Sequence, residues 1–391
     1  GGVDGQLSSQ RTYANQQSLD TGGAGVQNSS NPSASTSDGG VSVAAAIALN
    51  IADVSARAWL PDGLTLIAGA AVLLLASEQV DGIVQADGTA LATKDAGVGA
   101  AVALNLVFLE NRAWAGADTT VQANGFTASA TMTAVGSDRS HDFSAIANAG
   151  AGSPDVGVAG AVALNIVTDR TEAWIPSSAV VDFGTGDVVV AAENLRTDTA
   201  KAKADAKGGG SSTGVGASVA INVIAVNLTR AEIEDGADVT GGANVWVTAD
   251  ATDTVIAEVT AGSSGGNAVS PAVGINVVLP VTLARIGTPG PRPFVASGDI
   301  VVRGTYKGSA TVTGNADAAG ASVAVGAIIV INVVDIDPIA AVYRDITGAS
   351  LWLIATTELH TRAEATASAQ GTKSSTQGGA QNSDAQAQDQ L

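Results

Sequence analysis

The sequence predicts an all-β protein, and more specifically a parallel β-solenoid (β-helix) built from six tandem repeats of about 56 residues. A short apolar motif that ends in Asn recurs at a nearly constant interval along the chain. Val, Ile and Thr dominate the apolar runs, and Gly recurs inside them, which favours strands over helices. Large residues alternate with Gly, Ala and Ser, so that the second face is small rather than charged and both faces are predicted to be covered.

Six copies of the motif account for most of the chain. The clearest reads Val215-Gly-Ala-Ser-Val-Ala-Ile-Asn222, and the spacings between the final Asn residues are 55, 60, 57, 54 and 56 residues. The six residues are Asn50, Asn105, Asn165, Asn222, Asn276 and Asn332. Because stacked turns of chain bring equivalent residues into line, we expect these amides to bond to one another in a ladder.

A second periodic feature follows three of the motifs. Trp59, Trp114 and Trp174 each stand nine residues after the Asn, and we expect them to stack as a second ladder. The fourth copy has Glu232 at the matching place one residue late, which indicates a bulge or a longer corner. Gly/Asp turns such as Pro61-Asp62-Gly63 come next, followed by a second apolar run and a small polar tail.

This pattern divides the chain into three parts. Residues 1–40 form a tail rich in Gly, Ser, Gln and Asn that belongs to a preceding repeat, residues 41–369 form the six-repeat solenoid, and residues 370–391 lead to a next repeat. An unbroken strand of about 20 residues would span roughly 65 Å, longer than ordinary strands. We therefore expect the runs to break at corners, most naturally at the Asn residues. Two or three coils per repeat would give a rod roughly 60–90 Å long.

Composition and charge exclude several classes of protein. The formal net charge of −19 disfavours nucleic acid and anionic lipid as partners. The absence of Cys excludes disulfides and thiolate metal sites. The apolar stretches Leu64–Ala76 and Ala319–Val334 are too short for membrane-spanning helices. The chain opens at Gly1 without a leader, and we interpret it as an excised or processed segment.

The motif resembles the repeats of very large bacterial surface proteins. Its core, followed by Thr229-Arg-Ala-Glu-Ile-Glu-Asp-Gly-Ala-Asp-Val239, is similar to repeats of leukotoxin-type filamentous adhesins and autotransporter-like exoproteins. The resemblance covers residues 41–365, although Pro271, Pro280 and Pro291 interrupt the last two copies. It implies an extended β-structured stalk on the bacterial cell surface or outside the cell.

The candidates for chemistry have simpler structural interpretations. The three Trp residues would suit a glycan-binding strip, but we interpret them as a ladder that caps the sheet edge. His141, in Ser140-His141-Asp142, lacks a nucleophile elbow and is interpreted as part of a surface loop. The two distant residues His141 and His360 cannot form a zinc centre. Asp335 and Asp337 on one strand face are interpreted as a solvated edge or a loose, weak Ca²⁺ contact rather than a lyase or glycosidase pair. Asn28 and Asn227 match glycosylation acceptors by composition only.

The leading hypothesis is a non-enzymatic structural or adhesin segment with no catalytic, cofactor-binding or metal site. Its expected partners are copies of itself or flanking repeats, with surface glycans or receptors on host or neighbouring cells as further candidates, and open strand edges would permit head-to-tail assembly. A carbohydrate-binding or carbohydrate-cleaving β-helix is the alternative. A transmembrane β-barrel of about twelve strands is a second alternative, against which the three Tyr and the charges of Lys201–Lys207 weigh.

Overall fold

The computed structural model describes residues 40–210 and 212–371, and these residues form parallel β-sheets. A 13-stranded sheet contains all the long strands, and the short strands form a four-stranded and a two-stranded sheet. The all-β class and the parallel strands predicted from the sequence are confirmed. Within the described ranges, no helix has the length and hydropathy that a bilayer crossing requires.

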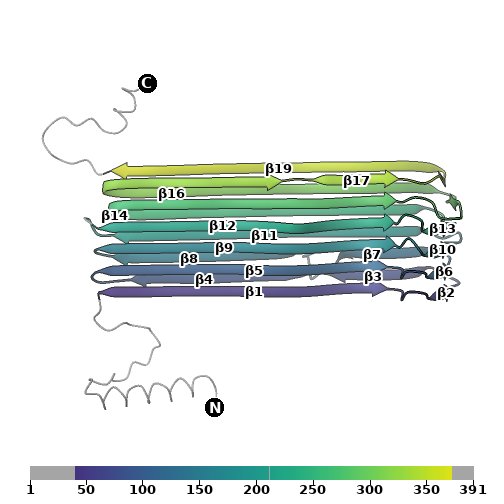
Figure 1. The fold of residues 1–391 in the computed structure, drawn as a ribbon, viewed down its shortest axis with the longest axis horizontal. Helices are drawn as coiled ribbons and strands as arrows, with labels where there is room; N and C mark the ends of the chain where they lie inside the picture. The colour runs from purple at the N-terminus through teal and green to yellow at the C-terminus, as the bar shows by residue number, and fades with distance from the viewer. Residues whose placement is uncertain (1–39, 211, 372–391) are drawn as a thin grey trace, which may run out of the picture. The chain divides into compact units, whose positions relative to one another are not determined.

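The long strands run alternately in two directions, which we call outgoing and returning (Figure 1). The first four outgoing strands are β1 (Val41–Trp59), β5 (Ala96–Trp114), β9 (Val156–Ile175) and β12 (Thr213–Ile233). The first three returning paths are β3 (Val72–Glu78) with β4 (Asp81–Leu91), β7 (Phe126–Met132) with β8 (His141–Ser153), and β11 (Val188–Gly208).

Two very long strands contain a returning arm and an outgoing arm each. They are β14 (Val245–Ile286) and β16 (Asp299–Val334); β17 (Asp337–Val342) continues the outgoing arm of β16, and β19 (Ser350–Gly371) is the last returning strand. Short strands lie between each outgoing and returning strand. They are β2 (Thr65–Ile67), β6 (Thr120–Gln122), β10 (Val180–Asp182), β13 (Asp238–Thr240), β15 (Phe294–Val295) and β18 (Ile346–Thr347).

Pairing is one-to-one between residues one motif apart. Each outgoing strand pairs with the next outgoing strand, so that Asn50 lies beside Asn105 and Asn105 beside Asn165. Each returning strand pairs with the next returning strand in the same way. The register shifts in β12 between Ile224 and Val226, which places Glu232 beside Trp174 and confirms the predicted bulge.

The Asn residues are not at corners, contrary to the expectation from strand length. Asn105 lies in the middle of β5, a strand of 19 residues without a break. Between successive Asn residues the chain makes one long return and one long outgoing path, instead of two or three coils. Six outgoing strands spaced by about 4.8 Å give a stack only about 30 Å high, so the predicted 60–90 Å rod is wrong.

Small residues on the inner faces allow the two directions of strand to lie very close together. Ala dominates one core cluster, in which Ala103, Ala147 and Ala204 are buried. At Gly99, an added Cβ would lie 2.0 Å from the carbonyl oxygen of Gly150, which belongs to a returning strand. The interior at this end is therefore thin.

The other end of the strands encloses a wider core beneath the short strands. Phe126, Phe183 and Phe294 are buried there with Val and Ile residues. The ring centroids of Phe126 and Phe183 are 6.0 Å apart, and those of Phe183 and Phe294 are 6.1 Å apart. The predicted turns lead into this region, and Gly63 and Gly236 adopt φ values of 70° and 78° that favour glycine.

The predicted terminal segments fall almost entirely outside the described residues. Only Gly40 of the 1–40 segment is described, and the 370–391 segment begins inside β19, which ends at Gly371.

Candidate functional site

The six motif Asn residues form one continuous hydrogen-bonded ladder inside the protein. Each side-chain amide nitrogen donates to the amide oxygen of the next Asn, at 3.2, 2.9, 2.8, 2.9 and 3.1 Å from the first to the last pair. The same nitrogens also donate to carbonyl oxygens of returning strands, as Asn165 does to Thr199 at 2.8 Å. The ladder therefore links the outgoing strands to the returning strands across the thin interior.

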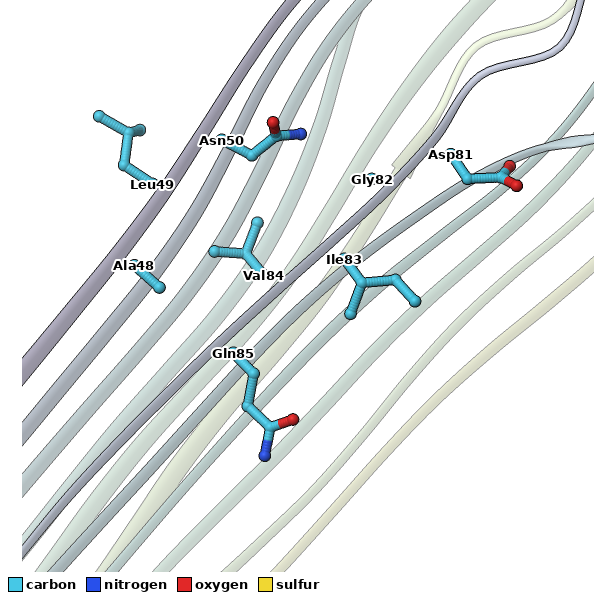
Figure 2. A pocket seen from close by; sticks show the side chains of 8 residues that line it. All are labelled: Ala48, Leu49, Asn50, Asp81, Gly82, Ile83, Val84 and Gln85. Carbon is cyan, nitrogen blue, oxygen red and sulfur yellow. The ribbon is translucent and has the colours of Figure 1, made fainter. Parts of the chain in front are cut away.

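The ladder has a single direction, because in every link the earlier Asn donates through its nitrogen and the later Asn accepts through its oxygen. The amide oxygen of Asn50 consequently has no donor among the described residues. It lies in a groove of about 580 Å³ between β1 and β4, where the inner surface of the first strands is open (Figure 2). At the other end, the amide nitrogen of Asn332 donates to the carbonyl oxygens of Ala310 at 3.0 Å and Arg362 at 2.7 Å.

The three predicted Trp residues stack on the outer face of the outgoing strands. The ring centroids of Trp59 and Trp114 are 5.4 Å apart, and those of Trp114 and Trp174 are 4.9 Å apart with planes 1° from parallel. The guanidinium of Arg230 continues the stack, 5.0 Å from the centre of the Trp174 ring. Both faces of the Trp114 ring are thus covered by its neighbours.

A ladder of ion pairs runs beside the Trp stack. Arg112 contacts Glu110 at 3.3 Å and Glu172 at 2.9 Å, and Arg230 contacts Glu172 at 2.9 Å. The ladder as a whole contains Arg57, Glu110, Arg112, Glu172, Arg230, Glu232, Arg285 and Asp235. Opposite charges alternate from strand to strand, so the outer face carries little net charge here despite the acidic chain.

A buried cluster of charged groups lies in the core between the thin and the wide parts. Arg196 is fully buried and contacts Asp198 at 2.7 Å, Asp253 at 3.1 Å and Asp169 at 3.3 Å. Burial raises the pKa of Asp198 to about 7, although the charge of Arg196 opposes the shift. Burial alone would lower the pKa of Arg196, but the three carboxylates raise it, so this side chain stays charged.

Glu78 and His141 form a second buried pair at the N-terminal side of this cluster. The Nδ1 atom of His141 accepts a hydrogen bond from the backbone N–H of Val80 at 3.0 Å, and its Nε2 atom lies 3.9 Å from Glu78. Burial, followed by the charge of Asp169, raises the pKa of Glu78 to about 8. Burial lowers the pKa of His141. Both groups are therefore neutral at neutral pH.

The sequence interpretation of His141 as a surface-loop residue is wrong. The loop ends before it, at the bridge between Val135 and Asp138, and His141 begins β8 with its side chain inside. Ser140 is not a nucleophile poised beside it, since its hydroxyl bonds to Asp138 at 3.0 Å and to Asp142 at 3.1 Å. Sequence reasoning also missed the buried positions of Arg196 and its carboxylates.

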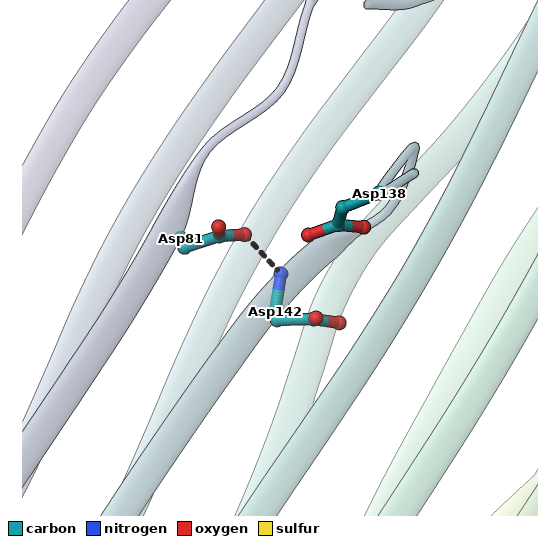
Figure 3. A group of neighbouring side chains, drawn as sticks. All are labelled: Asp81, Asp138 and Asp142. Atoms are coloured by element: carbon teal, nitrogen blue, oxygen red, sulfur yellow. Dashed lines mark hydrogen bonds between the residues drawn. The ribbon is translucent and has the colours of Figure 1, made fainter. Parts of the chain in front are cut away.

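An acidic group at the mouth of the same loop offers oxygen atoms that could hold a cation. Oxygens of Asp81, Asp138 and Asp142 lie within 4.8 Å of one another (Figure 3). Protein donors already engage all three carboxylates: Gln79 donates to Asp81 at 2.8 Å, the backbone N–H of Ser140 donates to Asp138 at 3.0 Å, and the Ser140 hydroxyl donates to Asp142 at 3.1 Å. The Ser140 N–H and hydroxyl lower the pKa of Asp138 below its usual range.

The remaining sequence candidates lie apart from one another. Asp335 is exposed between β16 and β17, Asp337 is exposed at the start of β17, and His360 is exposed on β19 beside Glu358. Asn227 is buried and donates to Asp253, so its side chain does not have the exposure that the acceptor motif requires. Asn28 lies outside the described residues.

The outer face of the outgoing strands carries a broad aliphatic area at its thin end, which we call the aliphatic face. Four columns of outward-facing residues, one residue from each outgoing strand, contain only Val, Ile and Leu. In β12 the four are Val215, Val219, Ile221 and Val223. The equivalent residues in the first strand are well exposed, with Ile47 79 % and Ile51 62 % accessible. The large residues thus point outward and the small ones inward.

Comparisons with known proteins give no relative: no family model, no curated protein and no solved structure matches the chain.

Proposed function

We propose that the chain is a segment of a non-enzymatic extracellular structural protein, a β-solenoid of six tandem repeats that serves as a rigid stalk, filament or adhesin body. The observation that carries the proposal is the register. Residues one motif apart pair directly in both directions of strand, from Asn50 with Asn105 to Asn276 with Asn332. Such stacking lets each repeat bury the surface of its neighbour, which is how solenoids gain stability.

The side-chain ladders support a mechanical role. The inner Asn ladder and the outer ladders of Trp rings and ion pairs each link successive strands along the stacking direction. Buried amides that are fully hydrogen-bonded hold one register, because a slip of a single residue would leave their partners unsatisfied. A rod with these links resists shear between its layers.

The direction of the Asn ladder supports head-to-tail joining. One end presents the amide oxygen of Asn50, which has no donor among the described residues, whereas at the other end both N–H groups of the Asn332 amide already bond to backbone carbonyl oxygens. The edges of β1 and β19 lie at the same two ends of the stack. A flanking repeat or a second copy can therefore continue the sheet, and it continues the ladder when one N–H of Asn332 exchanges the carbonyl oxygen of Ala310 for the incoming amide oxygen.

The location and the biological setting rest on the resemblance of the motif to repeats of leukotoxin-type filamentous adhesins. A bacterial cell-surface or extracellular location follows from that resemblance. A carbohydrate-binding role finds less support, because sugar rings need the open face of an aromatic ring and the faces of Trp114 are covered on both sides. A glycan array tests that role directly, and binding that is lost in Trp59→Ala would favour it.

Engineered disulfides test the solenoid register. The chain has no native Cys, so the pair Asp53→Cys and Phe108→Cys, which are register partners on the outer face, is expected to close a disulfide under mild oxidation. In the control, Asp53→Cys with Leu109→Cys, the second residue points inside and no bond is expected. Equal yields in the two variants, measured by mass spectrometry, would refute the register.

Electron microscopy tests the filament. At rising protein concentration we expect rods that lengthen by stacking, with a repeat near 4.8 Å along the rod axis in diffraction from aligned samples. The variant Asn50→Leu removes the free acceptor and is expected to shorten the rods. Isolated particles at every concentration would exclude head-to-tail assembly by this segment.

A further inference from the structure

We propose that the aliphatic face is a docking surface for a second copy of this chain, and that two copies associate face to face through it. This contact is separate from head-to-tail joining, because it uses the broad outer surface of the outgoing strands and leaves the edges of β1 and β19 free.

The size of the face matches a stable interface. The four columns, with one column of Ala, Gly and Pro between the first and the second, extend over nine residues along each strand, which is about 30 Å, and over six strands, which is again about 30 Å. The resulting area of roughly 900 Å² exceeds the largest apolar patch of a typical monomer, which is about 300–600 Å². It is close to the ~800 Å² that each partner contributes to a standard protein–protein interface.

The apolar residues of the aliphatic face form continuous columns and are not scattered singly over the surface. Every member of the four columns is Val, Ile or Leu, whereas the opposite outer face, on the returning strands, carries mostly polar residues, such as Lys201 beside Glu258. The two faces of one thin structure therefore differ sharply in polarity. A buried face and a solvated face account for this difference.

The chain itself offers nothing apolar enough to cover the face. The segments outside the described residues, 1–39 and 372–391, are dominated by Gly, Ser, Gln, Asn and Asp, and contain few large aliphatic residues. A second copy supplies what is missing, namely a flat surface of the same area, residue size and strand spacing. Two such sheets pack face to face about 10 Å apart in β-sandwiches.

A second copy fits better than a lipid surface. The columns end where Asp53 and then the ion-pair ladder of Arg57 and Glu110 begin on the same strands, so a bilayer resting on this flat surface would also meet alternating charges. The net charge of −19 further opposes contact with anionic lipid. Two copies can overlap their aliphatic halves alone and leave the charged halves in water.

The test compares the same substitution on the two outer faces. Ile221→Lys places a charge at the centre of the aliphatic face, and Ile256→Lys places the same charge on the outer face of a returning arm. By analytical ultracentrifugation we expect the unaltered chain and Ile256→Lys to be dimeric at about 10 µM. We expect Ile221→Lys to weaken the dimer at least about 100-fold, because each interface would bury two unpaired charges.

Two further measurements keep the test decisive. If Ile221→Lys fails to fold by circular dichroism, the double variant Val219→Thr with Ile221→Thr, which keeps β-branched residues, is expected to weaken the dimer with unchanged secondary structure. Flotation with neutral phosphatidylcholine vesicles measures the competing partner. Three results would overturn the proposal. The unaltered chain could be a monomer at 100 µM, or both Lys variants could weaken the dimer equally. The third is a monomeric chain that binds vesicles in a way that depends on Ile221.

Discussion

The thin end of the interior is predicted to tolerate no added methyl group, and Gly99→Ala tests this. An ideal Cβ on Gly99 would lie 2.0 Å from the carbonyl oxygen of Gly150 and 2.5 Å from that of Gly88. Both oxygens belong to the backbone of returning strands, so no side-chain rotation relieves the clash. The outgoing and returning strands would have to move apart, and the van der Waals contacts between Ala side chains around Gly99 would be lost.

We expect Gly99→Ala to lower the free energy of unfolding by about 3 kcal/mol, at the upper end of the range for overpacked cores. The matched control is Gly160→Ala on the neighbouring strand β9, where an added Cβ meets no atom within 4 Å. That change is expected to raise stability by about 0.5 kcal/mol through the lower entropy of the unfolded chain. Urea unfolding followed by circular dichroism measures both values. Equal stability of the two variants would refute the close approach of the strands.

Three further predictions concern the ladders and the buried acid. Asn165→Ala removes two bonds at 2.8 Å and is expected to cost about 3 kcal/mol in urea unfolding, whereas Asn50→Ala, at the open end, should cost under about 1 kcal/mol; equal costs would contradict the ladder. Trp114→Ala breaks both stacking contacts and should abolish the exciton signal of the Trp stack in circular dichroism, and an unchanged spectrum would count against the stack. Glu78 has a folded pKa of about 8, above its ordinary 4.5, so between these pH values the folded state holds a proton that the unfolded state has released. The contribution of Glu78 to the free energy of unfolding is therefore complete below pH 4.5 and is lost as the pH rises to 8. Glu78→Gln should flatten this part of the stability profile and raise stability at pH 8 by about 3 kcal/mol; a slope that persists would refute the buried acid.

The features that the sequence predicted well are those that repeat. Asn165, Trp114 and the late Glu232 could be placed because equivalent residues recur at a fixed spacing, and direct pairing turns that spacing into contact. Even the bulge in β12 was visible as one extra residue between two periodic positions. Periodicity carries this information without any knowledge of which face is inside.

The number of turns per repeat could not be obtained in the same way. The ordinary length of strands argued for a corner at each Asn, yet the large outward-facing residues Val219, Ile221 and Val223 keep the same parity on both sides of Asn222. A real corner would interrupt that parity. The unbroken parity was thus the signal for a strand of about 20 residues, and a general expectation about length outweighed it.

The buried charges were missed because polar residues in a strand suggest a solvated face. Asn194, Arg196 and Asp198 have the same parity along β11 as Val188 and Val190, so they share the inner face. Parity alone predicts their burial once the inner face is known. Their partners come from β9 and β14, however, and that convergence depends on how outgoing and returning strands face each other, which a single sequence does not specify.

The inversion of residue size at the thin end, where Gly and Ala lie inside and Val, Ile and Leu outside, links the shape of the protein to its assembly. A thin interior requires small side chains, since the backbones at Gly99 and Gly150 approach too closely for anything larger. Small residues bury little apolar area each, so at the thin end part of the hydrophobic stabilisation that the outward-facing large residues can provide remains unused in the single chain. That stabilisation becomes available only when another surface covers the aliphatic face. A solenoid of this kind is therefore expected to be more stable at concentrations where its copies associate, and its unfolding midpoint should rise with protein concentration, whereas that of Ile221→Lys should not. A midpoint independent of concentration in the unaltered chain would show that the aliphatic face remains uncovered.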